Sequence, residues 1–177
     1  MQSITEKQKN MMTALKEKFG YTSIMQVPKL QKIVVSAKVG SMKDKNKIEV
    51  VTDRLALITG QKPKANPAKK SIATFKLREG TIIGYSVTLR GKNMENFLDK
   101  LIHIALPRTR DFRGLEVKAI DEMGNYTIGI KEHTIFPETS DEDLHDVFGL
   151  GITLVTTAKT KEEAEAFLRE LGLPLKK

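Results

Sequence analysis

The sequence predicts an α+β fold, in which a mainly antiparallel sheet carries helices on one face and leaves a basic and polar face exposed. Two observations lead to this prediction. Segments with the spacing of amphipathic helices are interleaved with segments in which apolar and polar residues alternate. Several alternating segments also lie close enough to pair as hairpins. The 177 residues, 40% apolar and 29% charged, suit one core, so we expect a single domain over residues 1–177.

Four helices are expected, at residues 3–19, 45–60, 93–106 and 160–172. Apolar residues recur in each at steps of three and four, which is typical of a helix with one buried face. Gly20 and Gly60 stand where a C-terminal cap belongs, and Pro107 is expected to end the third helix. Thr160, with Glu163 three residues later, forms a capping box for the last one.

Five strands are expected, at residues 30–40, 74–80, 81–91, 126–138 (interrupted at Pro137) and 152–157. A short turn at Glu79-Gly80 joins the second and third strands and predicts a hairpin. Ahead of them, the pair Asn66-Pro67 favours a turn. The stretch around it, residues 64–80, holds five basic residues and one acidic residue. So much positive charge around one turn calls for a partner.

Alternation along these strands places basic and hydroxyl side chains on the exposed face of the sheet. The residues assigned to this face are Lys32, Ser36, Lys38, Lys76, Arg78, Thr88 and Arg90. Lysine and arginine neutralise phosphates, and hydroxyls hydrogen-bond to phosphate oxygens or ribose 2′-OH groups. The face therefore predicts a nucleic-acid partner, with a merely solvated face as the alternative.

Charge is unevenly distributed along the chain. The net charge is +8, residues 62–92 alone carry +7, and residues 111–177 carry −6. A basic N-terminal portion of this kind favours a polyanion. The acidic C-terminal portion is either solvated or meets a basic partner.

Several classes of protein are disfavoured. There is no cysteine, so disulfides and thiolate metal sites are excluded. The N-terminal segment lacks the apolar region of a secretory signal, and no apolar run approaches the roughly 18 residues of a membrane span. Walker, GxGxxG and GxSxG motifs are absent. We therefore expect a soluble intracellular protein that is not an enzyme and needs no cofactor.

The sequence contains three histidines. His103 is expected on a helix surface, and His133 in a polar turn at a strand end. His145 lies in SDEDLHD, residues 140–146, where acids and an imidazole could bind a metal ion. The same segment also fits a helix start, with Ser140 as N-cap and acids in the first turn. Capping is favoured, and a metal-dependent phosphoesterase remains an alternative at this point.

Several separate segments resemble one family. They are, in order, MQVPKLQKIVV, LITGQKP, AKKSIATFKLREG, VTLRG, FLDKLIHIALPRTRDFRG, GNYTIGIKE, IFPE and VTTAKT. They are similar to bacterial-type ribosomal protein L-five of the large subunit, a 5S rRNA-binding family, from about residue 19 onward. The resemblance implies a structural protein of the cytoplasmic ribosome that binds 5S rRNA and anchors it in the central protuberance. Large-subunit rRNA and other ribosomal proteins are the further partners implied.

The resemblance also implies binding residues. The implied rRNA contacts are Ser36, Gln61, Thr88 and Arg90, to which the polar face adds Lys32 and Lys38. Where the family has asparagine, a larger residue and glycine, this chain has Ser36-Ala37-Lys38. Serine offers one donor fewer than asparagine, and Lys38 adds a charge. The contact at this point is either kept by Ser36 and Lys38 or abandoned.

The family's basic hairpin corresponds to residues 64–80 and reaches the elbow of the P-site tRNA. Its tRNA contacts map onto Lys69, Lys70, Ser71, Ile72, Ala73 and Thr74. We expect Phe75 to anchor the hairpin to the sheet, with stacking on sugar or base as the alternative. The family also contacts a basic small-subunit protein, here through residues 110–114 or 140–146. A stand-alone RNA chaperone or regulator is the alternative function.

Overall fold

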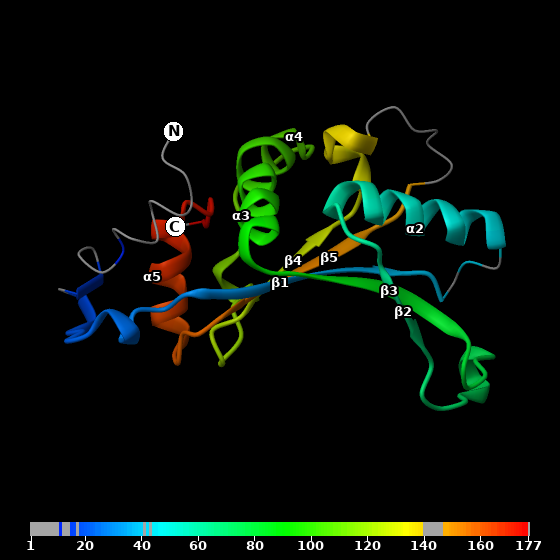
Figure 1. Ribbon diagram of the computed structural model, residues 1–177, viewed down its shortest axis with the longest axis horizontal. Coiled ribbons are helices and arrows are strands. Elements are labelled where there is room, and N and C mark those ends of the chain that lie inside the picture. The colour runs from blue at the N-terminus through cyan, green and yellow to red at the C-terminus, as the bar shows by residue number, and fades with distance from the viewer. Residues whose placement is uncertain are drawn as a thin grey trace. The chain divides into compact units, whose positions relative to one another are not determined.

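The computed structural model of the chain describes residues 11, 15, 16, 18–40, 42, 44–139 and 147–176 (Figure 1). The strands are β1 (Leu30–Lys38), β2 (Lys64–Pro67), β3 (Ile82–Leu89), β4 (Tyr126–Ile130) and β5 (Leu150–Thr156). They form one antiparallel sheet in the order β2-β3-β1-β5-β4. The longer helices are α2 (Lys45–Thr59), α3 (Gly91–Lys100) and α5 (Lys161–Leu171). The predicted α+β class is confirmed.

The chain divides into two compact units. The first consists of Met1–Ile33, Leu89–Ile128 and Thr153–Lys177, and the second of Val34–Thr88 and Gly129–Ile152. Strands β1, β3, β4 and β5 contribute residues to both units. None of the described helices in either unit is long and apolar enough to cross a membrane.

In the second unit, α2 lies over one face of the sheet (Figure 1). Its residues Val51, Leu55 and Ile58 are buried, at the spacing of three and four that the sequence predicts. Asp44 begins the helix because its side chain accepts a hydrogen bond from a first-turn N–H at 3.1 Å. Gly60 ends the helix at a φ of 67°, a left-handed conformation that glycine adopts readily.

Strand β1 shows the alternation that separates the two faces of the sheet. Val35 and Ala37 are buried. Between and after them, Ser36 is half-buried and Lys38 is exposed. Because successive side chains of a strand point to opposite faces, the buried pair belongs to the helix-covered face and the other pair to the open, polar face.

In the first unit, the helix expected to end at Pro107 continues past it. α3 passes through a π-helical turn, η3 (Leu101–Ala105), into the short helix α4 (Leu106–Arg108). In the π turn the N–H of Leu106 donates to the carbonyl of Leu101. Proline lacks an N–H, and its ring collides with the carbonyl four residues back in a regular helix. The wider π turn accommodates it, so the predicted helix end was wrong.

The N-terminal part of α5 is held by side-chain hydrogen bonds. Thr160 caps the helix, as predicted, by accepting from the N–H of Glu163 at 3.3 Å. The carboxylate of Glu163 accepts from the Tyr21 hydroxyl at 2.9 Å. Of the helix predicted at residues 3–19, the structure describes residues 11, 15, 16, 18 and 19 as helical. Its other positions lie outside the described residues.

The segment around Asn66-Pro67, expected as a turn, is strand β2. It pairs antiparallel with β3, and Asn66 lies opposite Gly84 in the ladder. The register shifts between Asn66 and Pro67. Proline is tolerated here because β2 is an edge strand. Pairing with β3 therefore overrides the local turn preference of the dipeptide.

The segment at residues 74–80, expected as a strand, contains a 3₁₀ turn, η2 (Ala73–Phe75). An isolated bridge joins Ile72 to Leu77 across this turn. Lys76 has a φ of 51°, which breaks the extended backbone that the apparent alternation implied. The strand prediction was wrong here, although β3 itself is present as predicted.

Further along, the strand expected over residues 126–138 is shorter. β4 ends at Ile130, and the chain continues as two 3₁₀ turns, η5 (His133–Ile135) and η6 (Pro137–Thr139). The hydroxyl of Thr139 donates to the carbonyl of His133 at 2.9 Å and ties these turns together. Two further 3₁₀ turns are η1 (Ile24–Gln26) and η4 (Val117–Ala119).

Candidate nucleic-acid interface

The open face of β1, β2 and β3 in the second unit carries a cluster of polar side chains that we call the polar strip. Its members are Ser36, Lys38, Lys64, Asn66, Ser86 and Thr88. Lys64 lies directly opposite Ser86 in the β2–β3 ladder. The amide of Asn66 donates to the Ser86 hydroxyl at 3.0 Å. The strip thus combines cations with hydroxyl and amide groups, which suits phosphate and ribose.

Ser36 is less available to a ligand than the sequence suggests. Its hydroxyl donates to the carbonyl of Gly151 on β5 at 3.2 Å. A Cβ on Gly151 would lie only 3.0 Å from the same hydroxyl oxygen, so glycine leaves room for the hydroxyl to lie against the sheet. A serine hydroxyl has one proton, and here that proton is used inside the protein.

Close packing of β1 against β3 depends on Gly84. A Cβ at this position would lie 2.8 Å from the carbonyl oxygen of Ala37, a distance that real Cβ atoms essentially never show. The missing side chain brings the two backbones close together. Ser36, Lys38, Ser86 and Thr88 stand on these two strands.

The tip of the β2–β3 hairpin, residues 68–81, is a closed loop. The N–H of Ala68 donates to the carbonyl of Thr81 at 2.8 Å, and the N–H of Gly80 donates to the carbonyl of Ala68 at 3.0 Å. Within the loop, the Glu79 N–H donates to the Ser71 hydroxyl at 2.9 Å. All six residues predicted to contact tRNA are exposed on it: Lys69, Lys70, Ser71, Ile72, Ala73 and Thr74.

Phe75 does not anchor this hairpin. Its side chain is 77% exposed, because it lies in the 3₁₀ turn η2 and not in a strand. The anchoring prediction was therefore wrong. Because the ring of Phe75 is exposed beside Lys76 in a basic loop, stacking of this ring on a sugar or base remains the alternative prediction.

Lys32 and Arg90 belong to the first unit and are described apart from the polar strip. Lys32 is half-buried on β1. Arg90 is exposed at the N-cap position of α3, where its side chain makes no capping hydrogen bond. Its guanidinium therefore faces solvent.

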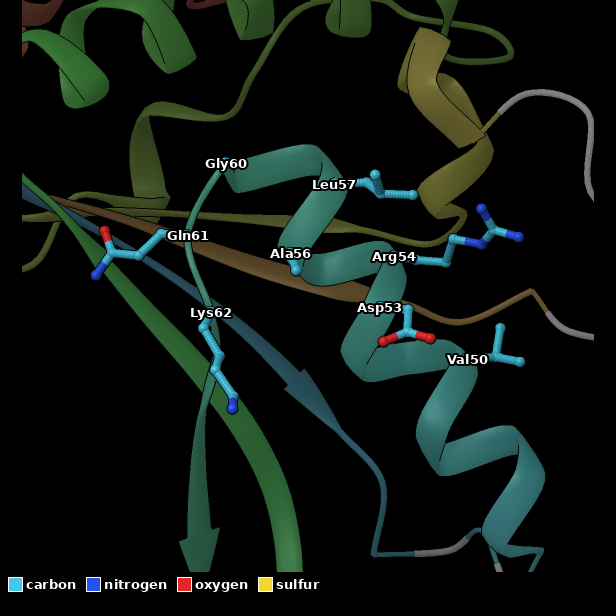
Figure 2. A pocket seen from close by; sticks show the side chains of 8 residues that line it. All are labelled: Val50, Asp53, Arg54, Ala56, Leu57, Gly60, Gln61 and Lys62. Atoms are coloured by element: carbon cyan, nitrogen blue, oxygen red, sulfur yellow. The ribbon is translucent and has the colours of Figure 1, made fainter.

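Gln61 borders a shallow hollow of about 710 Å³ beside α2. Figure 2 shows that Gln61 and Lys62 point away from Val50, Arg54 and Leu57 on the helix. The side chains around the hollow diverge, so no set of functional groups converges on one small molecule there. Gln61 itself is exposed, as an RNA contact requires.

His133 is buried and not in a polar turn as predicted. It is fully excluded from solvent and stacks on Phe148, with ring centroids 4.0 Å apart. Its Nδ1 accepts a hydrogen bond from the Phe148 N–H at 3.3 Å. Burial lowers the pKa of His133, and the nearby positive charge of Arg54 lowers it further. These contacts give His133 a structural role, whereas His103 is exposed on its helix as expected.

The part of the chain that the structure describes holds no candidate metal site. Within that part, no three histidine, aspartate or glutamate side chains could hold a metal ion. Burial raises the pKa values of Tyr21 and Tyr126 to about 12, reinforced by Glu163 and Glu116 respectively. Both tyrosines thus stay protonated hydrogen-bond donors. The segment 140–146, with the alternatives of a helix cap or a metal site, lies outside the described residues.

These features define a class of protein: an α+β protein whose open sheet face and basic hairpin suit a polyanion. Comparison with known families identifies it further. A model described as ribosomal protein L5 matches residues 23–78, and a model of the C-terminus of the same ribosomal family matches residues 82–175. The chain belongs to the ribosomal protein L5 family.

Two relatives illustrate the similarity. Large ribosomal subunit protein uL5 of Streptococcus pyogenes serotype M49 is 53% identical over 165 residues, which cover 93% of this chain and 92% of that protein. Large ribosomal subunit protein uL5 of Flavobacterium johnsoniae is 51% identical over 173 residues, covering 97% and 94%. The resemblance found in the sequence is thereby confirmed.

Family membership makes the chain an RNA-binding ribosomal protein of translation, with ribosomal RNA and other ribosomal proteins as partners. Its relatives are named as proteins of the large ribosomal subunit. The expectations of a ribosomal location and of a protein that is not an enzyme are therefore confirmed. Sequence reasoning missed Lys64 and Asn66 as polar-strip residues, because it took their segment for the approach to a turn. The signal available in the sequence was the spacing of Lys64 and Asn66, which are two residues apart as on one face of a strand.

Proposed function

We propose that the chain is a structural component of the large ribosomal subunit that binds 5S rRNA through the open face of its sheet. In this role it anchors 5S rRNA in the central protuberance, and residues 1–177 act as one domain. The proposed rRNA-binding residues are Lys32, Ser36, Lys38, Gln61, Thr88 and Arg90, joined by Lys64, Asn66 and Ser86. The polar strip is the observation that carries the proposal.

The strip supports RNA binding because it offers two kinds of contact. Exposed Lys38 and Lys64 neutralise phosphates and fix the position of the RNA. Asn66 and Ser86 are already hydrogen-bonded to each other, so little side-chain freedom is lost when they meet a 2′-OH. Double-helical RNA displays its 2′-OH groups in a wide, shallow groove, which an open sheet face can approach.

The hairpin tip is proposed to reach the P-site tRNA. Its exposed lysines, Lys69 and Lys70, suit the phosphates of the tRNA elbow, and the exposed ring of Phe75 can stack on a sugar or base. Ser71, Ile72, Ala73 and Thr74 complete the proposed tRNA contact.

The contact with a basic small-subunit protein is proposed to involve residues 140–146. This segment has four acidic residues and no lysine or arginine. The other candidate, residues 110–114, has two arginines and one aspartate. A basic partner is attracted by the first segment and repelled by the second.

The experiment is a gel-shift titration of the full chain against 5S rRNA at ~150 mM salt, because polyanion affinity depends strongly on salt. A tRNA and an unrelated RNA hairpin of equal length serve as competitors. A clear preference for 5S rRNA is expected. Equal binding of all three RNAs would overturn the 5S assignment in favour of a stand-alone RNA chaperone or regulator.

A charge-neutral variant tests the face itself. Asn66→Ala with Ser86→Ala is expected to weaken 5S rRNA binding by about thirtyfold, since each of the two lost hydrogen-bonding groups is worth ~1 kcal/mol. Thr127→Ala with Thr153→Ala is the matched control, because these hydroxyls also form a cross-strand pair, at 3.2 Å. Equal losses of 5S rRNA affinity in the two double variants would indicate that the binding face extends toward β4 and β5.

A further inference from the structure

The last residue of α4 and the loop that follows it carry a group of arginines. Arg108, Arg110 and Arg113 lie within six residues, and all three are exposed. None of their side chains makes a hydrogen bond or ion pair with any residue that the structure describes. Arg169 is a useful contrast, because it bonds to Glu165 at 2.8 Å and to the carbonyl of Lys176 at 2.8 Å. We call residues 108–113 the arginine loop.

The arginine loop is fixed at its beginning by the helix before it. α4 follows the π turn and includes Pro107, and proline has little backbone freedom. The N–H of Thr109 donates to the carbonyl of Leu106 at 3.1 Å and closes the helix end. Arg108 is thus the last residue of a helix with a well-defined end.

The loop is fixed at its other end by the C-terminal segment. The N–H of Leu115 donates to the carbonyl of Pro174, and the N–H of Lys176 donates to the carbonyl of Leu115, both at 2.8 Å. Gly114 precedes this bridge with a φ of 92°, and a Cβ there would lie 3.2 Å from the Pro174 carbonyl oxygen. Any side chain at residue 114 would disturb the closure.

Between these two ends the backbone is strained at Asp111, which has a φ of 51°. A non-glycine residue in this region costs free energy and tends to occur where geometry serves a function. Burial does not explain this loop, since Arg110, Asp111 and Arg113 are all exposed. The strained, doubly anchored backbone holds the guanidinium groups on a loop of defined shape.

We propose that the arginine loop binds the phosphate backbone of ribosomal RNA, as a contact separate from the polar strip. A guanidinium offers a planar fork of donors that matches two phosphate oxygens. Asp111 is the only acid among residues 108–113, which leaves the loop a charge of +2. A basic protein partner would be repelled, and an apolar one would leave the charges unpaired. The proposal rests on the ribosomal setting of the proposed function.

The test compares two charge-matched triple variants of the full chain. The first is Arg108→Gln, Arg110→Gln and Arg113→Gln. The control is Lys118→Gln, Lys159→Gln and Lys161→Gln, three exposed cations of the same unit. Filter binding at several salt concentrations uses two probes, a 5S rRNA transcript and a transcript of the long rRNA of the large subunit. The probe that loses affinity tells which RNA the loop contacts.

Each phosphate contact contributes ~0.7–0.9 to the slope of log affinity against log salt. The arginine variant is therefore expected to lower that slope by about 2–3 for one of the two probes, and the lysine variant to leave it nearly unchanged. Replacing the same arginines with lysine is expected to keep the slope and still lower affinity, because the fork is lost. Circular dichroism verifies folding of every variant.

Two outcomes would overturn the proposal. Equal losses in the arginine and lysine variants would mean that only overall charge matters. Unchanged slopes for both RNAs would mean that the loop meets no RNA, and a loss confined to assembled subunits would then identify an acidic protein partner. Neither outcome depends on the polar strip. If the proposed binding of 5S rRNA by the strip is wrong, the Asn66 and Ser86 variants reveal it separately.

Discussion

The hydroxyl of Ser36 on β1 donates its only proton to the backbone carbonyl of Gly151 on β5, at 3.2 Å. Thr88, another residue of the polar strip, is exposed. A hydroxyl whose proton is already used can only accept a hydrogen bond from RNA, whereas a free hydroxyl can both donate and accept. The two residues are therefore expected to differ in binding and in stability.

Ser36→Ala is expected to lower the free energy of unfolding by ~1 kcal/mol, the usual net value of an internal hydrogen bond. Its effect on 5S rRNA affinity is expected to be small. Thr88→Ala is expected to leave stability unchanged and to weaken 5S rRNA binding by about fivefold. Urea denaturation and gel-shift titration measure the two quantities. Weaker binding by the Ser36 variant than by the Thr88 variant would contradict this division of roles.

Arg90→Ala is expected to weaken 5S rRNA binding by about five- to tenfold, because an exposed guanidinium contact to phosphate is lost. Arg169→Ala is the control. It loosens the contact between α5 and the C-terminal segment, since Arg169 bonds to the carbonyl of Lys176, but is expected to keep full RNA affinity. Filter binding measures the 5S rRNA affinity of both variants. Equal losses of affinity would contradict the assigned binding face.

Removing Lys69 and Lys70 together is expected to leave 5S rRNA affinity almost unchanged and to impair tRNA positioning in assembled ribosomes. Both lysines are on the closed hairpin tip and not on the polar strip. Chemical footprinting of P-site tRNA measures the effect. A large loss of 5S rRNA affinity instead would assign the tip to the rRNA site.

Phe75→Ala is expected to leave the free energy of unfolding within ~0.5 kcal/mol of the natural chain, as is usual for an exposed surface side chain. It is expected to add to the tRNA defect of the Lys69 and Lys70 variant, because a stacking surface is lost. Leu77→Ala, at a half-buried position of the same loop, is the comparison. A Phe75 variant that is as destabilised as a core truncation would restore the anchoring role.

His133 is expected to make folding sensitive to acid. Its pKa in the folded state is lowered from 6.5 by burial, so the unfolded chain binds the proton more readily. Stability is then full above the unfolded pKa and falls as pH drops below about 6.5, until the lowered folded pKa is reached. An NMR titration of the His133 ring is expected to show a midpoint below 6.5.

A substitution separates this residue from other titrating groups. His133→Gln is expected to be less stable at neutral pH and to lose part of the pH dependence of unfolding below about pH 6.5. His103→Gln, at an exposed position, is the control. Identical pH profiles for the natural chain and the His133 variant would show that this imidazole does not govern acid sensitivity.

Much of the fold was predictable because local signals and tertiary structure agree. α2 spans Lys45–Thr59 and ends one residue before its expected end. This end was predictable because glycine is the usual residue at a helix C-terminus. The open face of β1 followed from the alternation of polar Ser36 and Lys38 with buried Val35 and Ala37. Period-2 patterns are reliable where one face is fully buried.

Other features depend on contacts between distant residues and carry weak local signals. β2 forms because β3 pairs with it, in spite of the turn preference of Asn66-Pro67, and the π turn forms so that the helix can include Pro107. The internal bond of Ser36 requires the missing side chain of Gly151, 115 residues away in sequence. For the same reason Asn66 was absent from the predicted site.

Strand β2 also affects what happens to the chain before it reaches RNA. An edge strand offers unpaired N–H and C=O groups to any other strand, including that of a second copy of the same protein. Here the edge is four residues long, includes Pro67 with no donor, and carries exposed Lys64. Short length, proline and lysine are the features by which natural edges resist aggregation. The strand that we propose to bind rRNA is thus also expected to resist pairing between newly made copies before assembly.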